Sequence, residues 1–275
     1  MGSRNKMGQH SNSQENQETV GGGNWKVIFN YANAPNLGDK CIDDIMKSRI
    51  LDHSNAIIIG GGGLIYGSEP HFNQCLELLE KGQSEGKKLI LLGVGATNEL
   101  TSDQETRLRK IPLDLVTVRD HVTKEYLECI GINSELCADI SFLAKPQSRG
   151  TPNNYVFAIR PLSLNLKLRI RTLNHLEYVA MDPRFDLGTY YGRWQTVLDK
   201  IAGRVISARL HPIIFAMIKG IPFEDYTSGK AISIIEDFNL IGLDGMIKRA
   251  ERNFKLLAEI IGDDKVKFEH DSKRR

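Results

Sequence analysis

The sequence predicts an α/β protein built from two parallel β-sheets in tandem, each flanked by helices. Short β-branched or aliphatic runs alternate with amphipathic segments along most of the 275 residues, a pattern typical of doubly wound sheets. Two of these runs, Ala56–Ile59 and Lys88–Gly95, end in glycines, as buried parallel strands often do where they enter a loop. The proline- and glycine-containing stretch Lys145–Asn154 interrupts the alternation before it resumes, which predicts a domain boundary.

The first predicted domain spans residues 24–145, after a polar, aperiodic segment over 1–23 that predicts a disordered tail. Its strands share short runs of branched or leucine-rich residues and are predicted at Lys26–Tyr31, Ala56–Ile59, Lys88–Gly95, Leu115–Val118 and Ser134–Ala138. Its helices share apolar residues three and four positions apart and are predicted at Asp39–Leu51, Pro70–Lys81, Asp103–Lys110 and Val122–Ile130.

The second predicted domain spans residues 155–245 and is short for a domain of this kind. Its strands are predicted at Tyr155–Ile159, Tyr178–Met181, Arg204–Ser207 and Pro222–Tyr226. Its helices are predicted at Tyr190–Ala202, Pro212–Lys219 and Lys230–Phe238. Residues 246–264 contain an amphipathic helix, Met246–Ile261, that we expect to pack back across the first domain, and residues 265–275 form a charged tail.

Composition and charge exclude several classes of function. The chain is 41% hydrophobic and 25% charged, and 36 Lys and Arg against 34 Asp and Glu leave a net charge of +2, too little to indicate nucleic-acid binding. No apolar run reaches the length of a membrane span and no secretory leader is evident, so we expect a cytoplasmic protein that is not integral to a membrane. The four cysteines lack C-x-x-C spacing, which disfavours a zinc or redox site.

Four consecutive glycines, Gly60, Gly61, Gly62 and Gly63, follow the second predicted strand. Residues without a Cβ let the backbone take left-handed angles and approach a ligand or another backbone closely. With a helix expected to follow, the N–H groups of the loop favour an anion such as phosphate or carboxylate. The loop matches neither a G-x-G-x-x-G nor a Walker A pattern, so it does not indicate a nucleotide, and a turn that binds nothing is the alternative.

The segment Asn36-Leu37-Gly38-Asp39 lies between the first predicted strand and the first predicted helix. Asp39 is a candidate N-cap, with its carboxylate accepting N–H groups of the helix. It is also a candidate site carboxylate, able to orient or deprotonate a hydroxyl group. The two roles are compatible.

A second candidate site, Val118-Arg119-Asp120, follows the fourth predicted strand. The planar guanidinium of Arg119 suits bidentate binding of phosphate or carboxylate, and a surface salt bridge is the alternative. Asp120 is a candidate cap for the next helix.

The strongest single signal is Arg209-Leu210-His211-Pro212, between a predicted strand and a predicted helix. A cation and an imidazole at a helix N-terminus oppose the helix macrodipole, which is unfavourable unless an anion is present. We therefore interpret Arg209 as an anion ligand and His211 as a general acid or a hydrogen-bond donor. His53, His71, His121 and His175 are expected to be structural.

Taken in order, these motifs resemble the polysaccharide pyruvyltransferase family. The matching pieces cover roughly Val27 to Leu240 and are Asn36-Leu37-Gly38-Asp39, Gly60-Gly61-Gly62-Gly63-Leu64, Val118-Arg119-Asp120, Ala138-Asp139, Arg209-Leu210-His211, Ile221-Pro222 and Lys230. The resemblance implies a GT-B-like arrangement of two Rossmann-like domains, of which the second is shortened here. It also implies transfer of pyruvate from phosphoenolpyruvate to sugar hydroxyls of a polysaccharide or glycan precursor. A lipid-linked acceptor is compatible with this expectation.

By the same resemblance, Arg209 and His211 belong to the phosphoenolpyruvate site, with Leu210 lining it and Asn36 nearby. We add Arg119 as a second anion clamp, His211 as the acid that protonates the enolpyruvyl methylene, and Asp39 as the base near the acceptor. No Asp-x-Asp metal motif stands in a suitable loop, so no metal and no cofactor are expected. An oligomer is compatible with the sequence.

Two other functions stay open. One is a GT-B glycosyltransferase in which Arg209 and the glycine loop hold the diphosphate of a nucleotide sugar. The other is a catalytically silent relative that binds a sugar or an anion. The chain departs from the family at Gly93-Val94-Gly95-Ala96-Thr97, where many members have a Gly-Gln-Ser-Ile-Gly-Pro-like segment, and it is short between Ile159 and Arg204.

Overall fold

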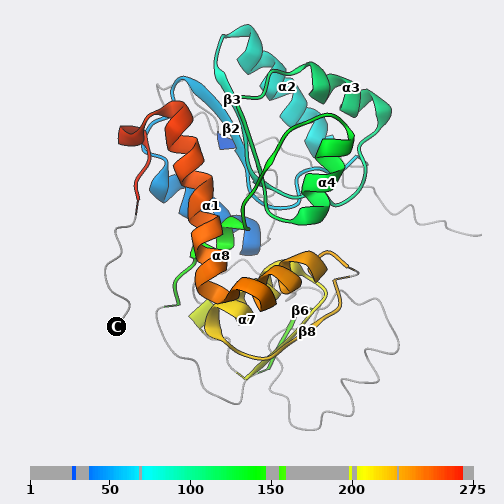
Figure 1. Cartoon of the computed structure of the whole chain (residues 1–275), viewed down its shortest axis with the longest axis vertical. Helices are drawn as coiled ribbons and strands as arrows, with labels where there is room; N and C mark the ends of the chain where they lie inside the picture. The colour runs from blue at the N-terminus through cyan, green and yellow to red at the C-terminus, as the bar shows by residue number, and fades with distance from the viewer. Residues whose placement is uncertain are drawn as a thin grey trace, which may run out of the picture.

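A computed structural model describes residues 27–28, 37–67, 70–146, 155–158, 198–199, 203–227 and 229–268 of the chain. Within these residues the strands form two sheets, one of five strands and one of three, and every strand pair is parallel (Figure 1). The α/β class and the parallel pairing predicted from the sequence are confirmed.

The strands of both sheets follow chain order. The first sheet comprises β1 (Val27–Ile28), β2 (Ala56–Gly60), β3 (Lys88–Val94), β4 (Leu115–Val118) and β5 (Glu135–Leu136). The second comprises β6 (Tyr155–Ala158), β7 (Arg204–Ser207) and β8 (Phe223–Asp225). The described strands therefore show no reversal from a central strand, which is the usual switch point of a doubly wound sheet.

The described helices connect and cover these strands. They are α1 (Leu37–Arg49), α2 (Pro70–Ser84), α3 (Ser102–Lys110), α4 (His121–Cys129), α7 (Leu210–Lys219) and α8 (Ile232–Ile261). Two short 3₁₀ helices, η1 (Ile140–Leu143) and η3 (Asp263–Lys265), follow β5 and α8. Most bounds lie within two or three residues of the predicted ones. For example, α1 begins two residues earlier than expected.

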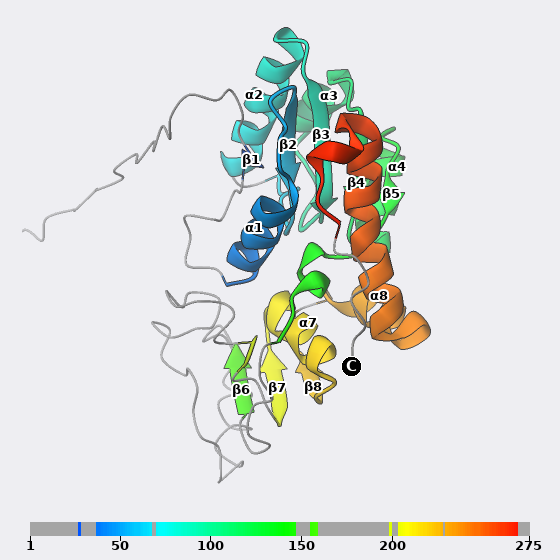
Figure 2. The same cartoon turned by 90° about the vertical axis from the view of Figure 1, so that its left-hand side faces the viewer.

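Side chains of the central strands point alternately to two faces of the first sheet, as the period of a β-strand requires. Ile57, Ile59 and Leu89 belong to one buried cluster, which α2, α3 and α4 complete. Ile58 and Ile90 belong to a second cluster, which α1 and α8 complete. Helices therefore cover both faces of the first sheet, as Figure 2 shows from the side.

The second of these clusters continues beyond the first sheet. It includes Phe142 of η1, Ile213 and Phe215 of α7, and Val205 of β7, all of them fully or almost fully buried. A single apolar core thus links the first sheet, through η1 and α7, to the second sheet. This core holds the carboxyl ends of β4 and β7 close to each other.

The prediction of two helices, Lys230–Phe238 and Met246–Ile261, agrees with the structure. The span labelled α8, Ile232–Ile261, contains the non-helical residue Gly242, with φ 65° and ψ −179°, which separates two helical stretches. Glycine adopts such angles without strain, so it ends the first stretch, and the second begins a few residues before the predicted Met246. The predicted packing of the second half of α8 on the first sheet is confirmed, because α8 contacts β3, β4 and η1.

Arg49 at the end of α1 joins that helix to α8. Its guanidinium pairs with both carboxylate oxygens of Glu251, at 2.5 and 2.9 Å, and lies 5.0 Å from the ring centre of Phe254. The Arg49 side chain is only 5% exposed. Since the backbone N–H of Lys267 also donates to the carbonyl of Arg49, this residue connects three segments of the chain.

Replacing Arg49 with alanine should therefore lower the free energy of unfolding by about 3 kcal/mol, because it leaves the Glu251 carboxylate without its partner and removes buried packing. Chemical denaturation measures this directly. The matched control is Arg252→Ala on the same helix, since the Arg252–Glu135 pair is about half exposed on both sides. That variant should lose less than about 1 kcal/mol. Equal losses in the two variants would contradict the role assigned to Arg49.

Several predicted features lie outside the described residues, namely the tail over 1–23, Asn36, the strand Tyr178–Met181 and most of the helix Tyr190–Ala202. The division into domains at 145 and 155 stays a prediction. Among the residues assigned to the charged C-terminal tail, Val266 is buried and forms an antiparallel bridge with Ile50. No helix in the described part of the chain combines the length and apolar character needed to cross a membrane.

Candidate functional site

The predicted site residues meet where the carboxyl ends of the two sheets face each other. Arg119 follows β4, Asp139 precedes η1, and Arg209 and His211 lie at the start of α7 after β7. Asp39 lies in the first turn of α1. Figure 2 shows α1, η1 and α7 between the two sheets, and we call this place the junction.

Arg119 is buried at the junction, with 5% of its side chain exposed, and is not part of the surface salt bridge considered as an alternative. Its Nη1 donates to Asp139 Oδ2 at 3.2 Å, and its Nε lies 3.4 Å from Asp120 Oδ2. Its Nη2 donates to no atom of the described residues. Arg119 is thus held on two sides, through Nη1 and Nε, and its role as an anion clamp stays a prediction.

Glycines leave the space that the Arg119 guanidinium fills. A Cβ on Gly95 would overlap this group, and a Cβ on Gly63 would lie 3.6 Å from Nη2. Nη2 therefore lies between the glycine loop after β2 and the end of β3. Glycine at position 95 is what allows the guanidinium to approach the backbone; at Gly63 an added Cβ would make only ordinary contact with Nη2 and would instead meet Thr97 Oγ1 at 2.7 Å.

The other glycines of the loop accommodate side chains of α1. A Cβ on Gly60 would lie 2.8 Å from Met46 Cε, and one on Gly62 would lie 2.7 Å from Asp39 Oδ1. A Cβ on Gly61 would overlap Ile42. Close approach of the loop was predicted from the sequence, but at these positions the partner is helix α1 of the same chain. Binding of an anion by the loop stays a prediction.

His211 packs directly against the start of α1. A Cβ on Gly38 would fall within the imidazole ring, so only glycine fits at that position. Nε2 of His211 lies 3.7 Å from Asp139 Oδ2, too far for a hydrogen bond, and this buried nitrogen has no hydrogen-bond partner among the described residues. An unpaired buried nitrogen is uncommon, and it commonly marks a place where a ligand or a proton binds.

Asp139 connects Arg119 to His211, a role that the sequence did not suggest. Its Oδ2 faces both of these groups, while its Oδ1 accepts hydrogen bonds from the backbone N–H of Ser141, at 3.0 Å, and from the Ser141 hydroxyl, at 2.7 Å. Asp139 thereby caps η1 and is completely buried. Both of its oxygens are fixed.

Asn253 of α8 supports the backbone next to Asp139. Its amide nitrogen donates to the carbonyl of Ala138 at 3.0 Å, and its amide oxygen accepts from the Thr117 hydroxyl at 2.5 Å. Thr117 in turn accepts from the backbone N–H of Gly93 at 2.7 Å. This buried set of hydrogen bonds ties α8, β3 and β4 to the segment that carries Asp139.

Asp39 is buried in the first turn of α1, at its third residue, and is therefore not the N-cap considered from the sequence. Burial, as the largest effect, and the charge of Asp139 raise the pKa of Asp39 to about 7, although Arg119 and Arg209 act to lower it. Asp39 can therefore hold or release a proton near neutral pH, as a general acid or base requires.

Burial lowers the pKa of His211 to about 4; Asp139 opposes this effect, while Arg119 and Arg209 add to it. Burial alone would raise the pKa of Asp139, but His211, Arg119 and the two Ser141 hydrogen bonds together lower it. At neutral pH the Asp139 carboxylate is therefore ionised and the His211 imidazole is neutral.

Arg209 is the N-cap residue of α7, and its side chain makes no capping hydrogen bond. Its backbone is fixed instead, because its N–H donates to the Ser207 hydroxyl at 2.9 Å and its carbonyl accepts from that hydroxyl at 2.7 Å. The side chain is half-buried and its charge acts on both Asp39 and His211. Leu210 is buried in the core that joins the sheets.

The pKa of Asp39 predicts a pH-dependent effect on stability. Because this pKa is higher in the folded chain, the folded state binds more protons than the unfolded state between pH 4 and 7, and stability falls through Asp39 as the pH rises. Asp39→Asn removes this effect, so the difference in free energy of unfolding between the variant and wild type should change in favour of the variant as the pH rises, by about 1.4 kcal/mol per pH unit between pH 5 and 6 and by about half that slope at pH 7. Urea denaturation across this range measures it. Asp44→Asn, an exposed site on the same helix, is the control and should follow wild type; parallel curves for Asp39→Asn would contradict the assignment.

Outside the junction, the prediction of a helix cap at Asp120 is confirmed, since its Oδ1 accepts the backbone N–H of Thr123 at 2.7 Å. His121, expected to be structural, has its Nε2 3.3 Å from Asp237 of α8. Cys41 and Cys75 lie in α1 and α2, are buried and form no disulfide. Within the described residues no group of three or more His, Cys, Asp or Glu side chains could hold a metal ion.

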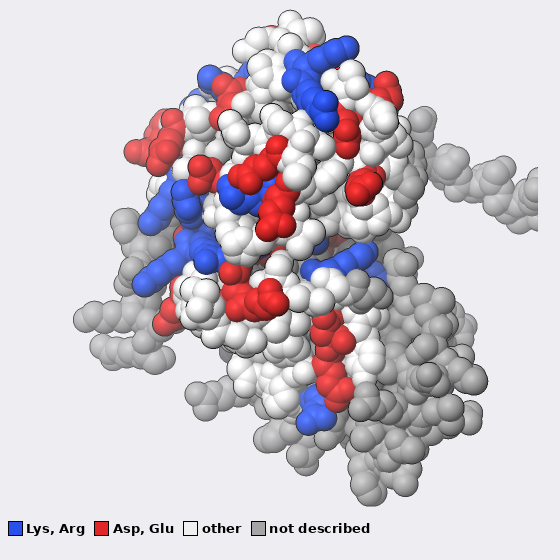
Figure 3. Space-filling view, turned by 45° about the vertical axis from the view of Figure 1, so that its right-hand side comes forward, with Lys and Arg blue, Asp and Glu red and all other residues white. Residues whose placement is uncertain are grey.

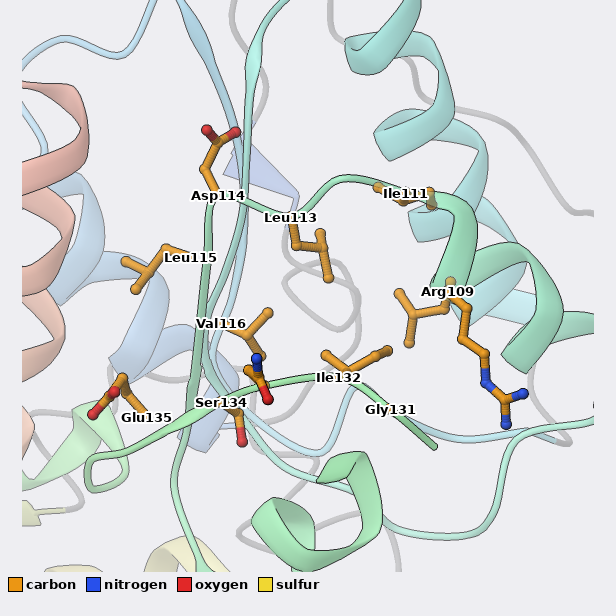
Figure 4. Close-up of a pocket in the computed structure, with 12 residues that line it drawn as sticks. Arg109, Ile111, Leu113, Asp114, Leu115, Val116, Gly131, Ile132, Ser134 and Glu135 are labelled. Atoms are coloured by element: carbon orange, nitrogen blue, oxygen red, sulfur yellow. The ribbon is translucent and has the colours of Figure 1, made fainter. Parts of the chain in front are cut away.

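A pocket of about 380 Å³ lies at the opposite end of the first sheet, where the chain enters β4 and β5 (Figure 4). Its floor is apolar, and each charged residue at its rim already has an ion-pair partner: Arg109 with Glu105, Asp114 with Lys88, and Glu135 with Arg252. It contains none of the predicted site residues and offers no unpaired cation to an anionic substrate.

The charged surface agrees with the small net charge. On the face shown in Figure 3, Lys and Arg side chains lie among Asp and Glu side chains rather than gathering in one basic area. This described face therefore lacks the electrostatic footprint of a nucleic-acid-binding protein.

Comparisons with known proteins add the following. A family model described as polysaccharide pyruvyl transferase matches residues 23–223. Among solved structures, the chain is similar to a functionally uncharacterised protein from Klebsiella pneumoniae subsp. pneumoniae, at 19% sequence identity and a TM-score of 0.43, over 76% of this chain and 87% of that chain. No curated protein matches the chain.

Proposed function

The chain belongs to the polysaccharide pyruvyl transferase family, and we propose that it transfers pyruvate from phosphoenolpyruvate to sugar hydroxyls of a polysaccharide or glycan precursor. Family membership implies a transferase of this general kind. The observation that carries the more specific proposal is the meeting of Arg119, Arg209 and His211, from the two sheets, at one buried junction.

The chemistry of the donor fits these groups. Phosphoenolpyruvate carries a phosphate and a carboxylate on the same carbon, and each suits the forked N–H edge of a guanidinium. Arg119 offers Nη2 beside the glycine loop, and Arg209 lies on the opposite side, at the start of α7. The first-turn N–H groups of α7 add a favourable dipole for an anion.

The reaction needs an acid and a base. Protonation of the donor methylene by His211 would form an oxocarbenium-like carbon, which a sugar hydroxyl attacks as that hydroxyl loses its proton and phosphate later leaves. Asp39, with a pKa of about 7, is suited to receive the hydroxyl proton. Because its lowered pKa leaves the His211 imidazole neutral at neutral pH, this residue must gain a proton before it can act as the acid.

The remaining features of the proposal follow from the family and the fold. We propose a GT-B-like pair of Rossmann-like domains, with the donor between them, no metal or cofactor, and a cytoplasmic location. The proposed acceptor is a glycan, with or without a lipid carrier. The proposal is compatible with an oligomeric protein. The two parallel sheets and the opposed carboxyl ends of β4 and β7 support this arrangement.

Thermal stabilisation by ligands tests the donor. Phosphoenolpyruvate at about 100 times its dissociation constant should stabilise the folded chain by roughly 2.7 kcal/mol, which gives a clear rise in Tm. UDP- and GDP-sugars serve as the comparison and should give no rise. A rise with a nucleotide sugar alone would favour a glycosyltransferase, and stabilisation by phosphoenolpyruvate without turnover on any glycan would favour a silent relative.

A further inference from the structure

Among the described residues, the junction has no surplus of positive charge. Arg119 faces two carboxylates, Asp120 and Asp139, the charge of Arg209 acts on a third, Asp39, and His211 is neutral. Phosphoenolpyruvate brings about three negative charges, two on its phosphate and one on its carboxylate. Binding these charges at a buried site without surplus positive charge has a high desolvation free energy, unless the site gains positive charge at the same time.

His211 is the group placed to gain that charge. Its buried Nε2 has no hydrogen-bond partner among the described residues and lies 3.7 Å from Asp139 Oδ2. That oxygen also accepts from Arg119 Nη1, so Asp139 stands between the imidazole and the guanidinium expected to bind the donor. Because Ser141 holds the other oxygen of Asp139, the Asp139 carboxylate cannot rotate away from His211.

We propose that binding of the donor is coupled to uptake of one proton by the His211 imidazole, and that Asp139 is the positioning residue that directs the proton there. The proposal rests on the proposed function. One proton leaves the bulk buffer and bonds to the ring, no bond of the donor changes, and the imidazolium turns an N–H toward Asp139. The ring then carries the proton that the methylene carbon of the donor requires.

The charged groups around His211 account for the direction of this effect. They are Asp39 from α1, Arg119 after β4, Asp139 before η1, and Arg209 at the start of α7. The two guanidiniums disfavour a charged imidazole, and a bound anion offsets their charge. Burial, the largest effect that lowers the pKa of His211, remains, but Asp139 and the bound anion then both favour the charged imidazole, which becomes more basic.

Isothermal titration calorimetry of the full chain with phosphoenolpyruvate at pH 7, in buffers of different ionisation enthalpy, counts the protons taken up. Asp39 also titrates near this pH, so the comparison is made in an Asp39→Asn background. There we expect more than about half a proton per donor bound. The free donor phosphate, whose pKa is near 6, already carries about a tenth of a proton at this pH, and any proton that it gains or loses on binding is measured in the Asp139→Asn variant described next.

The positioning role is tested by adding Asp139→Asn, which keeps the size of the side chain and removes its charge. Proton uptake should then fall to the contribution of the donor alone. Glu135→Gln is the matched control, because Glu135 lies four residues earlier on the same segment but is exposed and pairs with Arg252. With that control the uptake should stay unchanged. A merely structural role of Asp139 would weaken binding without changing the number of protons per donor.

A second measurement uses the same Asp39→Asn background. The Kd of this variant for phosphoenolpyruvate should rise as the pH rises from 6.5 to 8.5, by up to about tenfold per pH unit for each proton taken up. A Kd that does not change with pH, together with buffer-independent heats, would overturn proton uptake while leaving the donor assignment intact. Absence of phosphoenolpyruvate binding would overturn the proposed function and this inference together.

Discussion

Replacing Arg209 with alanine should abolish useful binding of phosphoenolpyruvate while the protein stays folded. Loss of a guanidinium paired with a desolvated anion costs about 2–5 kcal/mol, which corresponds to a rise in Kd on the order of 30- to 5,000-fold. The fold should survive, because the Arg209 side chain does not cap α7 and its backbone is fixed by Ser207. Titration of the donor into each variant, with Tm measured in parallel, gives both quantities.

Arg204→Ala is the matched control for this result. Arg204 stands at the other end of β7, where its side chain is about half exposed and pairs with Glu224 at 3.1 Å. Its replacement should leave donor affinity and Tm close to wild type. Wild-type affinity in Arg209→Ala would remove Arg209 from the donor site, and a large drop in Tm would show that the residue is structural instead.

Replacing His211 with glutamine should lower kcat by about 10²- to 10⁴-fold, the usual contribution of a general acid, with a smaller change in KM. Glutamine retains hydrogen-bonding capacity but cannot carry the transferable proton. Steady-state kinetics with phosphoenolpyruvate and a glycan acceptor measures the two constants separately. An unchanged kcat would exclude His211 as the acid.

Gly38→Ala offers an independent route to the same test. The added methyl group would fall within the imidazole ring and must displace it, although alanine itself favours the helix. We expect a loss of kcat in this variant that adding His211→Gln does not deepen, because both changes remove the same acid. Independent, multiplying losses would contradict a shared cause.

Local patterns in the sequence predicted most of the described elements. The buried runs at Ala56–Gly60 and Arg204–Ser207 are strands because their branched side chains suit a sheet covered by helices. The cap at Asp120 was predicted because its position between a strand and a helix requires an acceptor for the first N–H groups. These signals depend only on neighbouring residues, so one sequence is enough to detect them.

Contacts between distant segments could not be predicted in this way. Asp139 acts on His211, 72 positions later in the chain, and Asn253 supports Ala138 across a separation of 115 residues. Neither pairing leaves a periodic pattern. The partners of the glycine loop were missed for the same reason, because no local rule indicates that α1 and Arg119 occupy the space left by its glycines.

The position of α8 over the first sheet has a consequence for synthesis of the protein on the ribosome. Phe254 and Leu257 cover the face formed by Ile58, Ile90 and Leu92, yet they are translated more than 150 residues after those strands. Although α1 is made early and covers part of this face, the part under α8 must therefore stay uncovered until nearly the whole chain has emerged. A nascent chain of this kind folds late and offers chaperones a long-lived hydrophobic target.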